Sequence, residues 1–250
     1  MRCIHAAILC VAAVVVSQAA AAETLRILYE DRPPYYVTHA DGTVGGIVGG
    51  PVGEALHDAH IVHEWVIMPS SRQLFTIRHN DAYACSPGWF RNDERETFAK
   101  FSDVVYRDRP QVVAARSSDE NLFNDRSLKD ILADTRLILG VKTGFSYGET
   151  IDGLIAANAP VMVATTQSME GMRRMLTRRR FDYFIVAPEE FETLAAAALG
   201  DGATIVSIAH ADIPPGNARY LMCALQVPDD ILQRFNVALA RVIEQDGPQP

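Results

Sequence analysis

Short apolar runs alternate with amphipathic segments along most of this 250-residue chain. The runs at 25–29, 161–165 and 220–225 consist mainly of aliphatic and aromatic residues, a pattern typical of buried β-strands. The segment 228–243 instead repeats its apolar residues at helical spacing, which predicts a terminal helix with one buried face. Because strands and helices alternate, the pattern predicts an α/β architecture with mostly parallel sheets.

The N-terminal segment 1–22 has the features of a secretory signal peptide. Arg2 precedes the apolar run 3–16, and small residues containing an A-x-A cleavage signal precede Glu23. The apolar run is shorter than the ~20 residues that span a bilayer. We therefore expect cleavage after residue 22 and export of the remaining chain to the periplasm.

The charge and the glycine pattern exclude several classes of partner. The net charge is −8, and loss of the signal peptide also removes the positive charge of Arg2. A nucleic-acid partner is not expected, because phosphate binding requires a basic surface. The glycine-rich segment 45–53 lacks the spacing of a phosphate loop or a dinucleotide-binding loop. We therefore expect no cofactor. The histidines of segment 57–63 cross a predicted helix–strand boundary, so we also expect no metal site.

Two cysteines remain after removal of the signal peptide, Cys85 and Cys223. Each lies in an apolar, strand-like run, and an isolated pair in an oxidising compartment is a disulfide candidate. The alternative is a pair of buried free thiols. Alkylation of the unfolded protein with and without reductant distinguishes the two.

The stretch 85–110 carries the most specific signal in the chain. A Pro-Gly pair is followed by a predicted helical turn at 93–100, in which Arg95 lies between two glutamates, and then by the strand-like run 101–106. The Glu-Arg turn followed by Phe-Ser and a strand resembles the type 2 periplasmic solute-binding proteins of amino-acid ABC transporters. In that family the arginine of this turn binds the carboxylate of the ligand. The resemblance therefore implies that Arg95 anchors a ligand.

The resemblance implies an α/β, two-lobed periplasmic-binding-protein type 2 fold with two hinge crossovers. Two segments that break regular structure, 107–110 and 213–217, are the candidate hinges. In this fold the two cysteine-bearing runs are neighbours in the sheet of the first lobe. The expected divisions are a signal peptide (1–22), a discontinuous first lobe (23–109 and 217–250) and an inserted second lobe (110–216).

The resemblance also indicates which residues of the first lobe contact the ligand. In the family, the loop after the first strand supplies an acidic and an aromatic contact. For each candidate the alternative is a structural role, such as a helix N-cap for the serine at 70. The candidates besides Arg95 are Glu30, Tyr35, Tyr36, Ser70, Arg72, Ser86, Gly88 and Trp89.

In the second lobe, the sequence GFSYG at 144–148 has two interpretations. It resembles the family's glycine turn, where backbone N–H groups and a hydroxyl at a helix N-terminus bind an anion, which makes Thr143, Phe145 and Ser146 candidates. It also matches the G-x-S-x-G motif of serine hydrolases, with Ser146 as nucleophile and His210 downstream. No oxyanion motif precedes it, so the anion-binding turn is favoured.

One departure from the family concerns a possible amino group on the ligand. Amino-acid binders carry an aspartate at the end of a buried strand, where this chain has Ala187. Glu189 or Glu190 could replace it, or both could begin the next helix. The sequence therefore leaves open whether the ligand carries an amine.

The expected function is a periplasmic receptor that captures a small carboxylate-bearing ligand for an ABC permease or a sensor. We expect a monomer that closes about its hinges when the ligand touches both lobes. The alternative is an enzyme on the same scaffold, such as a cyclohexadienyl dehydratase, with Glu30 or Glu189 as general acid.

Overall fold

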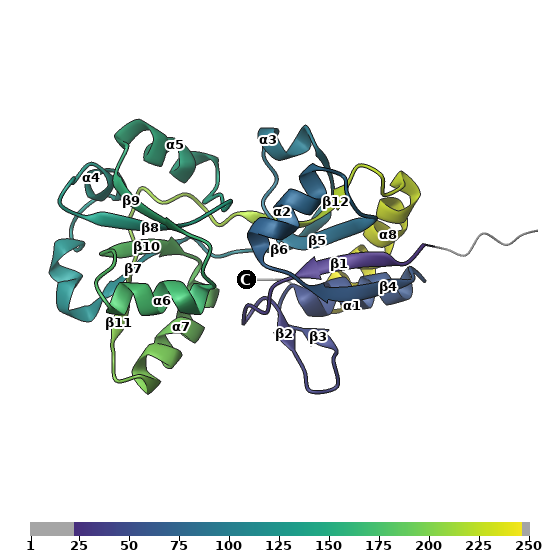
Figure 1. Cartoon of the computed structure of the whole chain (residues 1–250), viewed down its shortest axis with the longest axis horizontal. Helices are drawn as coiled ribbons and strands as arrows, with labels where there is room; N and C mark the ends of the chain where they lie inside the picture. Colours follow the sequence, from purple (N-terminus) through teal and green to yellow (C-terminus); the bar gives the residue numbers. More distant parts are fainter. Residues whose placement is uncertain (1–22, 247–250) are drawn as a thin grey trace, which may run out of the picture.

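The computed structural model describes residues 23–246, so the predicted signal peptide lies outside the described residues. Two five-stranded sheets, each flanked by helices, form two lobes that lie side by side (Figure 1). A small hairpin of β2 (Val37–Thr38) and β3 (Val44–Gly45) extends from the first lobe. No helix within 23–246 is long and apolar enough to cross a membrane.

The first lobe combines the N-terminal part of the chain with its C-terminal end. Helices α1 (Gly49–Asp58) and α8 (Asp229–Asp246) pack against each other, and α2 (Ser70–Arg78) lies on the side of the sheet opposite α1 (Figure 1). A short helix, α3 (Asp93–Glu96), precedes the edge strand. In spatial order the strands are β4 (His63–Ile67), β1 (Leu25–Tyr29), β5 (Ala84–Trp89), β12 (Ala218–Ala224) and β6 (Ala99–Arg107).

The second lobe is built from the central part of the chain. A 3₁₀ helix, η1 (Ser117–Leu122), follows the first strand to enter this lobe. In spatial order the strands are β11 (Ile205–Ile208), β7 (Val112–Arg116), β10 (Tyr183–Val186), β8 (Ile138–Lys142) and β9 (Val161–Thr165). One face carries α4 (Leu128–Leu132) and α5 (Glu149–Asn158), and the other carries α6 (Met169–Thr177) and α7 (Pro188–Gly200) (Figure 1).

Both sheets are mixed, which corrects the expectation of mostly parallel sheets. Strands β1, β4 and β5 are parallel, but β12 runs antiparallel to β5 and β6. In the second lobe β7 is antiparallel to both of its neighbours, whereas β8, β9 and β10 are parallel. The antiparallel pairs arise because β7 and β12 are the strands that follow the two crossings between lobes.

Each lobe has its own hydrophobic core. One cluster of buried apolar side chains fills the first lobe, and two further clusters cover opposite faces of the second sheet. Buried leucine, isoleucine and phenylalanine side chains each stabilise a fold by about 1.5–3 kcal/mol relative to exposed ones. Each sheet can therefore be held together by contacts made within its own lobe.

The two connections between lobes run next to each other. Residues 108–111 join β6 to β7, and residues 209–217 join β11 to β12. The N–H of Asp108 donates to the carbonyl oxygen of Asn217 at 3.0 Å. A Cβ atom at Gly216 would lie 1.6 Å from the carbonyl oxygen of Asp108, so this close approach requires glycine.

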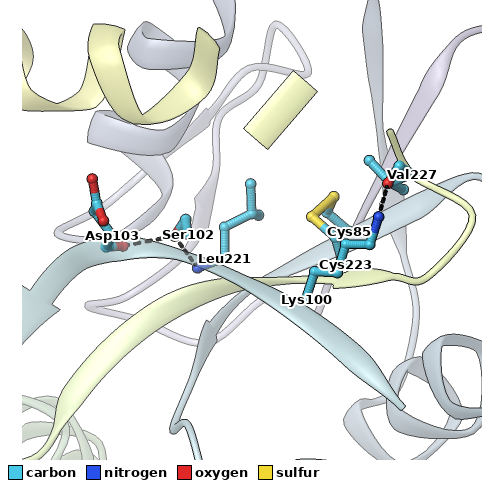
Figure 2. The surroundings of a disulfide bond; sticks show 7 residues. All are labelled: Cys85, Lys100, Ser102, Asp103, Leu221, Cys223 and Val227. Atoms are coloured by element: carbon cyan, nitrogen blue, oxygen red, sulfur yellow. Dashed lines mark hydrogen bonds between the residues drawn. A yellow bond between two sulfur atoms is a disulfide. The ribbon is translucent and has the colours of Figure 1, made fainter. Parts of the chain in front are cut away.

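The disulfide predicted from the sequence is present between Cys85 and Cys223. The two residues are direct partners in the antiparallel pair of β5 and β12, and both are fully buried. Figure 2 shows the bond beside Lys100 of β6, whose Nζ donates to the carbonyl oxygen of Val227 at 2.9 Å. The disulfide therefore joins the two parts of the first lobe that the second lobe separates in sequence.

A Pro-Gly pair in a sequence is typical of a turn, but the pair at 87–88 forms none, because β5 continues through it to Trp89. Gly88 has a φ of 79°, and a Cβ atom there would lie 1.8 Å from the hydroxyl oxygen of Tyr36. That hydroxyl donates to the carbonyl oxygen of Pro87 at 2.7 Å. Glycine is thus needed at 88 so that the loop after β1 can pack on the end of β5.

Candidate ligand-binding cleft

A cavity lies between the lobes, where strand ends and helix starts from both lobes converge. The first lobe contributes the loop after β1, the start of α2, the end of β5, α3 and the start of β12. The second lobe contributes the end of β8 and the turn after it, α6, the end of β10 and the start of α7. The charged lining residues are four cations and two carboxylates: Arg32, Arg95, Lys142, Arg219, Glu30 and Glu190.

Arg95 projects from the short helix α3 and is 5 % exposed. The side chain of Asn92 caps this helix by accepting the backbone N–H of Arg95 at 2.9 Å. The guanidinium donates to two backbone carbonyl oxygens, that of Phe90 at 2.6 Å and that of Gly144 in the opposite lobe at 3.2 Å. Among the described residues, no carboxylate forms an ion pair with it.

This environment is costly for a cation. Burial lowers the pKa of Arg95 to about 10, although Asp152 and Glu94 oppose the shift. The group remains protonated at neutral pH, so a positive charge is held in the cleft by neutral carbonyl groups. An anion placed beside Arg95 would accept charge-assisted hydrogen bonds from the guanidinium, and a carboxylate would accept two parallel ones.

A chain of hydrogen bonds fixes the aromatic wall next to Arg95. The guanidinium carbon lies 4.8 Å from the centroid of the Trp89 ring. The indole N–H of Trp89 donates to the Ser86 hydroxyl, which donates in turn to the side-chain oxygen of Gln73, both at 2.6 Å. Ser86 therefore acts through Trp89 and does not itself reach the cavity.

Arg219 is a second buried arginine in the cleft, but it has a carboxylate partner. Its Nε donates to Asp108 at 2.7 Å and its Nη1 donates to the carbonyl oxygen of Gly88 at 2.8 Å. The guanidinium carbon lies 4.0 Å from the ring centroid of Tyr35. Burial alone would lower the pKa of Arg219, but Asp108 more than offsets this and raises it.

Two ion pairs cross the cleft and connect the lobes. Arg32 makes a bidentate pair with Glu190, with N–O distances of 2.5 and 2.6 Å, and Glu190 is 1 % exposed. Lys142 donates to Glu30 at 2.7 Å. Burial lowers the pKa of Lys142, and the pairing with Glu30 opposes that shift. Most cleft charges are therefore neutralised within the protein.

The turn after β8 does not present its N–H groups in the way the sequence suggested. The N–H groups of Thr143, Phe145 and Tyr147 already donate to Thr165, Lys142 and Asp152 respectively. Helix α5 begins only at Glu149. The turn instead offers the carbonyl oxygen of Gly144 to Arg95.

The arrangement around Ser146 does not support a serine nucleophile. Its hydroxyl donates to Asp152 at 2.5 Å and accepts the N–H of Gly148 at 3.1 Å. His210, the downstream candidate base, bonds through Nδ1 to the carbonyl oxygen of Arg126. Ser146 thus closes the turn at the start of α5, a structural role.

The structure separates the expected ligand residues into two groups. Five of them do not line the cavity: Tyr35, Arg72, Ser86, Thr143 and Glu189. The others do: Glu30, Tyr36, Ser70, Gly88, Trp89, Arg95, Phe145 and Ser146.

Each residue in the group outside the cavity has an identifiable position. Tyr35 is buried and donates to Asp108, Arg72 and Thr143 are exposed to solvent, and Ser86 lies behind Trp89. Glu189 accepts hydrogen bonds from Tyr106 and from the backbone N–H of Arg109 near the crossing. These roles depend on which way each side chain points, which strand and helix patterns do not determine.

Sequence reasoning missed several charged and polar lining residues. Arg32 lies in the loop after the apolar run 25–29, and Arg219 directly precedes the run 220–225, where a charge usually marks only an exposed element end. Lys142 did leave a signal, because it is a charged residue at the end of an otherwise apolar strand. Gln111 carries no motif at all, yet it is 6 % exposed and lines the cavity.

The chain has the two-lobed fold of type 2 periplasmic solute-binding proteins. It superimposes on the arginine-bound form of a truncated ArgBP from T. maritima with a TM-score of 0.68 and 17 % identity, covering 88 % of this chain and 96 % of that one. No protein-family model and no curated protein sequence matches the chain.

Two further solved structures share the fold. An amino acid ABC transporter substrate-binding protein from Streptococcus pneumoniae, bound to L-arginine, gives a TM-score of 0.69 at 14 % identity, with 90 % of each chain covered. The GluR0 ligand-binding core from Nostoc punctiforme, in complex with (L)-glutamate, gives 0.67 at 15 %, covering 90 % of this chain and 94 % of that one. At these identities the likeness establishes the fold.

Proposed function

We propose that this protein is a periplasmic receptor that binds a small carboxylate-bearing ligand between its lobes. The observation that carries the proposal is Arg95, a buried cation in the cleft whose guanidinium, within residues 23–246, donates only to backbone carbonyl groups. A ligand carboxylate can replace the carbonyl of Gly144 and accept two parallel hydrogen bonds from the guanidinium. The neighbours of the same fold that were solved with arginine or glutamate support this assignment.

Ligand capture is proposed to involve movement of the lobes about the two crossings. The moving units are 23–109 with 217–250, and 110–216. Contacts that join the lobes, such as Arg95 to Gly144, favour the closed arrangement. A ligand that touches both lobes would stabilise that arrangement further, since it binds the open form less well.

The proposed setting is the periplasm, after removal of residues 1–22, with the receptor acting as a monomer. It would deliver its ligand to an ABC permease or report it to a sensor. An enzymatic role is not proposed. Glu30 and Glu189, the candidate general acids, are hydrogen-bonded to Lys142 and to Tyr106 with Arg109.

The test is a thermal-shift screen of the purified protein against small carboxylates, each paired with its methyl ester. The panel contains amino acids, hydroxy acids, oxo acids, dicarboxylates and prephenate. We expect some acids to raise the melting temperature and their esters to have no effect, because the ester removes the charge that Arg95 needs. Equal shifts by acid and ester, or no shift by any acid, would refute the proposal.

A further inference from the structure

The region of the cleft that could bind an amino group is already occupied by the protein. Ala187 directly follows β10 at the cavity and offers no side-chain acceptor. Glu190, one helical turn further, is the carboxylate that the second lobe contributes to the cavity lining, and both of its oxygens accept hydrogen bonds from Arg32. The Arg32 guanidinium carbon lies 5.2 Å from the Tyr35 ring centroid and 4.9 Å from that of Phe145. Arg32 therefore already pairs with Glu190, the carboxylate to which the ammonium group of a ligand would otherwise bind.

The other carboxylates of the cleft are also paired. Glu30 accepts from Lys142, and Asp108, just behind the lining, accepts from Arg219. Of the four lining cations, three therefore have a carboxylate and Arg95 has none. The cleft as built has one surplus positive charge. A ligand with a single negative charge balances it, whereas a zwitterionic amino acid leaves the surplus in place and adds an ammonium group without an anionic partner.

Gln111 supplies a neutral contact in the same cavity. This residue lies in the first crossing between lobes, and its side-chain oxygen is buried without a hydrogen-bond partner among the described residues. A primary amide can accept from a hydroxyl through its oxygen or donate to a keto oxygen through its nitrogen. A buried amide oxygen that has no partner is destabilising, so a ligand hydroxyl that donates to it gains affinity. A keto oxygen pairs instead with the amide nitrogen of Gln111.

We infer that the ligand is a monocarboxylate with a neutral hydroxyl or keto group in place of an amino group. This inference rests on the proposed function, because it assumes that Arg95 binds the carboxylate. Arg32 is the residue that determines the specificity, since it takes the carboxylate of Glu190 away from any ammonium group. The apolar lining from Phe90, Met169 and Met172 accommodates an apolar or aromatic substituent on the ligand.

The direct test compares matched ligands that differ in one group. The wild-type protein is titrated calorimetrically with L-leucine, its 2-hydroxy acid and its 2-oxo acid, and with the same three forms of L-phenylalanine. We expect the hydroxy or oxo acid of at least one set to bind at least ~100-fold more tightly than the amino acid, because the site leaves an ammonium group unpaired. Equal or tighter binding of the amino acids overturns the inference and leaves the receptor function standing.

Substitution of Arg32 tests the proposed cause. In Arg32→Gln, Glu190 becomes free to bind an ammonium group, so we expect the preference for the oxo acid over the amino acid to fall by at least ~10-fold. Arg32→Lys retains the cation and should retain the preference. The matched control is Arg26→Gln on β1, where the partly exposed Arg26 pairs with Glu64 of β4 at 3.8 Å, outside the cavity lining. It should leave the preference unchanged.

The double variant Arg32→Gln/Glu190→Gln distinguishes the role of Glu190 from a general loosening of the cleft. With no carboxylate at 190, the amino acid should lose the affinity that it gained in Arg32→Gln. If the double variant still binds the amino acid as well as the single variant does, Glu190 is not the ammonium site and the inference fails. If the wild-type protein binds no acid of either set or of the wider panel, both the inference and the proposed function fail.

Discussion

Arg95 and Arg219 are two equally buried arginines on the same side of one cavity, yet their surroundings differ. Both are 5 % exposed and both lie near an aromatic ring. The guanidinium of Arg219 has the carboxylate of Asp108 at 2.7 Å, whereas that of Arg95 has only carbonyl oxygens as acceptors in the part of the chain that the structure describes. Burial lowers the pKa of Arg95 to about 10. At Arg219 the charge of Asp108 outweighs the effect of burial, and the pKa is raised.

The difference indicates two kinds of role for buried charge. A buried cation that is paired with a carboxylate of the protein has a structural role. Removal of either partner leaves the other charge buried and unpaired, which destabilises the folded state. A buried cation that has no anionic partner in the protein remains able to bind an anionic ligand. Stability and ligand affinity should therefore respond in opposite ways at the two sites.

The largest expected effect comes from the disulfide that holds β12, the strand of Arg219, against β5. The variant Cys85→Ala/Cys223→Ala opens a covalent loop of sequence separation 138. A chain-entropy estimate predicts a loss of up to ~5 kcal/mol in the free energy of unfolding, measured with urea. Ligand affinity should stay within about threefold, because the Arg219–Asp108 pair fixes the cleft end of β12 separately. Reductant should destabilise the wild type and leave the double variant unaffected.

Arg219→Met should destabilise the fold by about 3–5 kcal/mol, since it leaves Asp108 buried without its partner. Urea unfolding at neutral pH measures the change. The companion variant Arg219→Met/Asp108→Asn removes the orphaned charge and should recover part of the loss. A stability close to that of the wild type in the single variant would show that Asp108 does not depend on this pair.

Arg95→Met should do the reverse. The free energy of unfolding should change by less than about 1 kcal/mol, because no buried carboxylate is left unpaired. Affinity for the carboxylate found in the screen should fall at least ~100-fold, or about 2.7 kcal/mol. Calorimetric titration and urea unfolding on one protein batch give both values. Unchanged affinity in a folded variant would remove Arg95 from the site.

Asp212 is an anionic counterpart of Arg95, because backbone groups hold its charge. It accepts the N–H groups of Leu128 and Lys129 at the start of α4, at 2.8 and 3.0 Å. Its partial burial raises the pKa, but these bonds more than offset that effect and lower it. Its stabilising contribution is therefore complete above the ordinary carboxyl pKa and is lost as the pH falls through the lowered value.

Asp212→Ala should accordingly reduce the free energy of unfolding by about 1 kcal/mol at pH 7. The difference from the wild type should shrink as the pH is lowered below about 4, where the unfolded state begins to bind the proton. Urea unfolding at several pH values measures it. A difference that stays constant down to the acid-unfolding range would mean that the charge of Asp212 is not what stabilises α4.

The sequence by itself determined the elements and their order. Strands β1 and β9 match the expected apolar runs, and helix α8 covers nearly all of the terminal helix expected at 228–243. Local hydrophobic periodicity and capping residues specify such elements without long-range information. The isolated cysteine pair and the Glu-Arg turn likewise indicated the disulfide, the two-lobed fold and a candidate anchor.

Only the tertiary structure decided how the charges pair. Arg32 and Glu190 lie 158 positions apart in sequence, Lys142 and Glu30 lie 112 apart, and Arg219 and Asp108 lie 111 apart. Local sequence patterns cannot specify these pairs, because each partner taken alone resembles the charged residues that commonly stand at the ends of strands and helices. Packing the two lobes together neutralises three of the cleft's cations and leaves Arg95 with carbonyl groups alone, and this balance of buried charge forms only when the chain is folded.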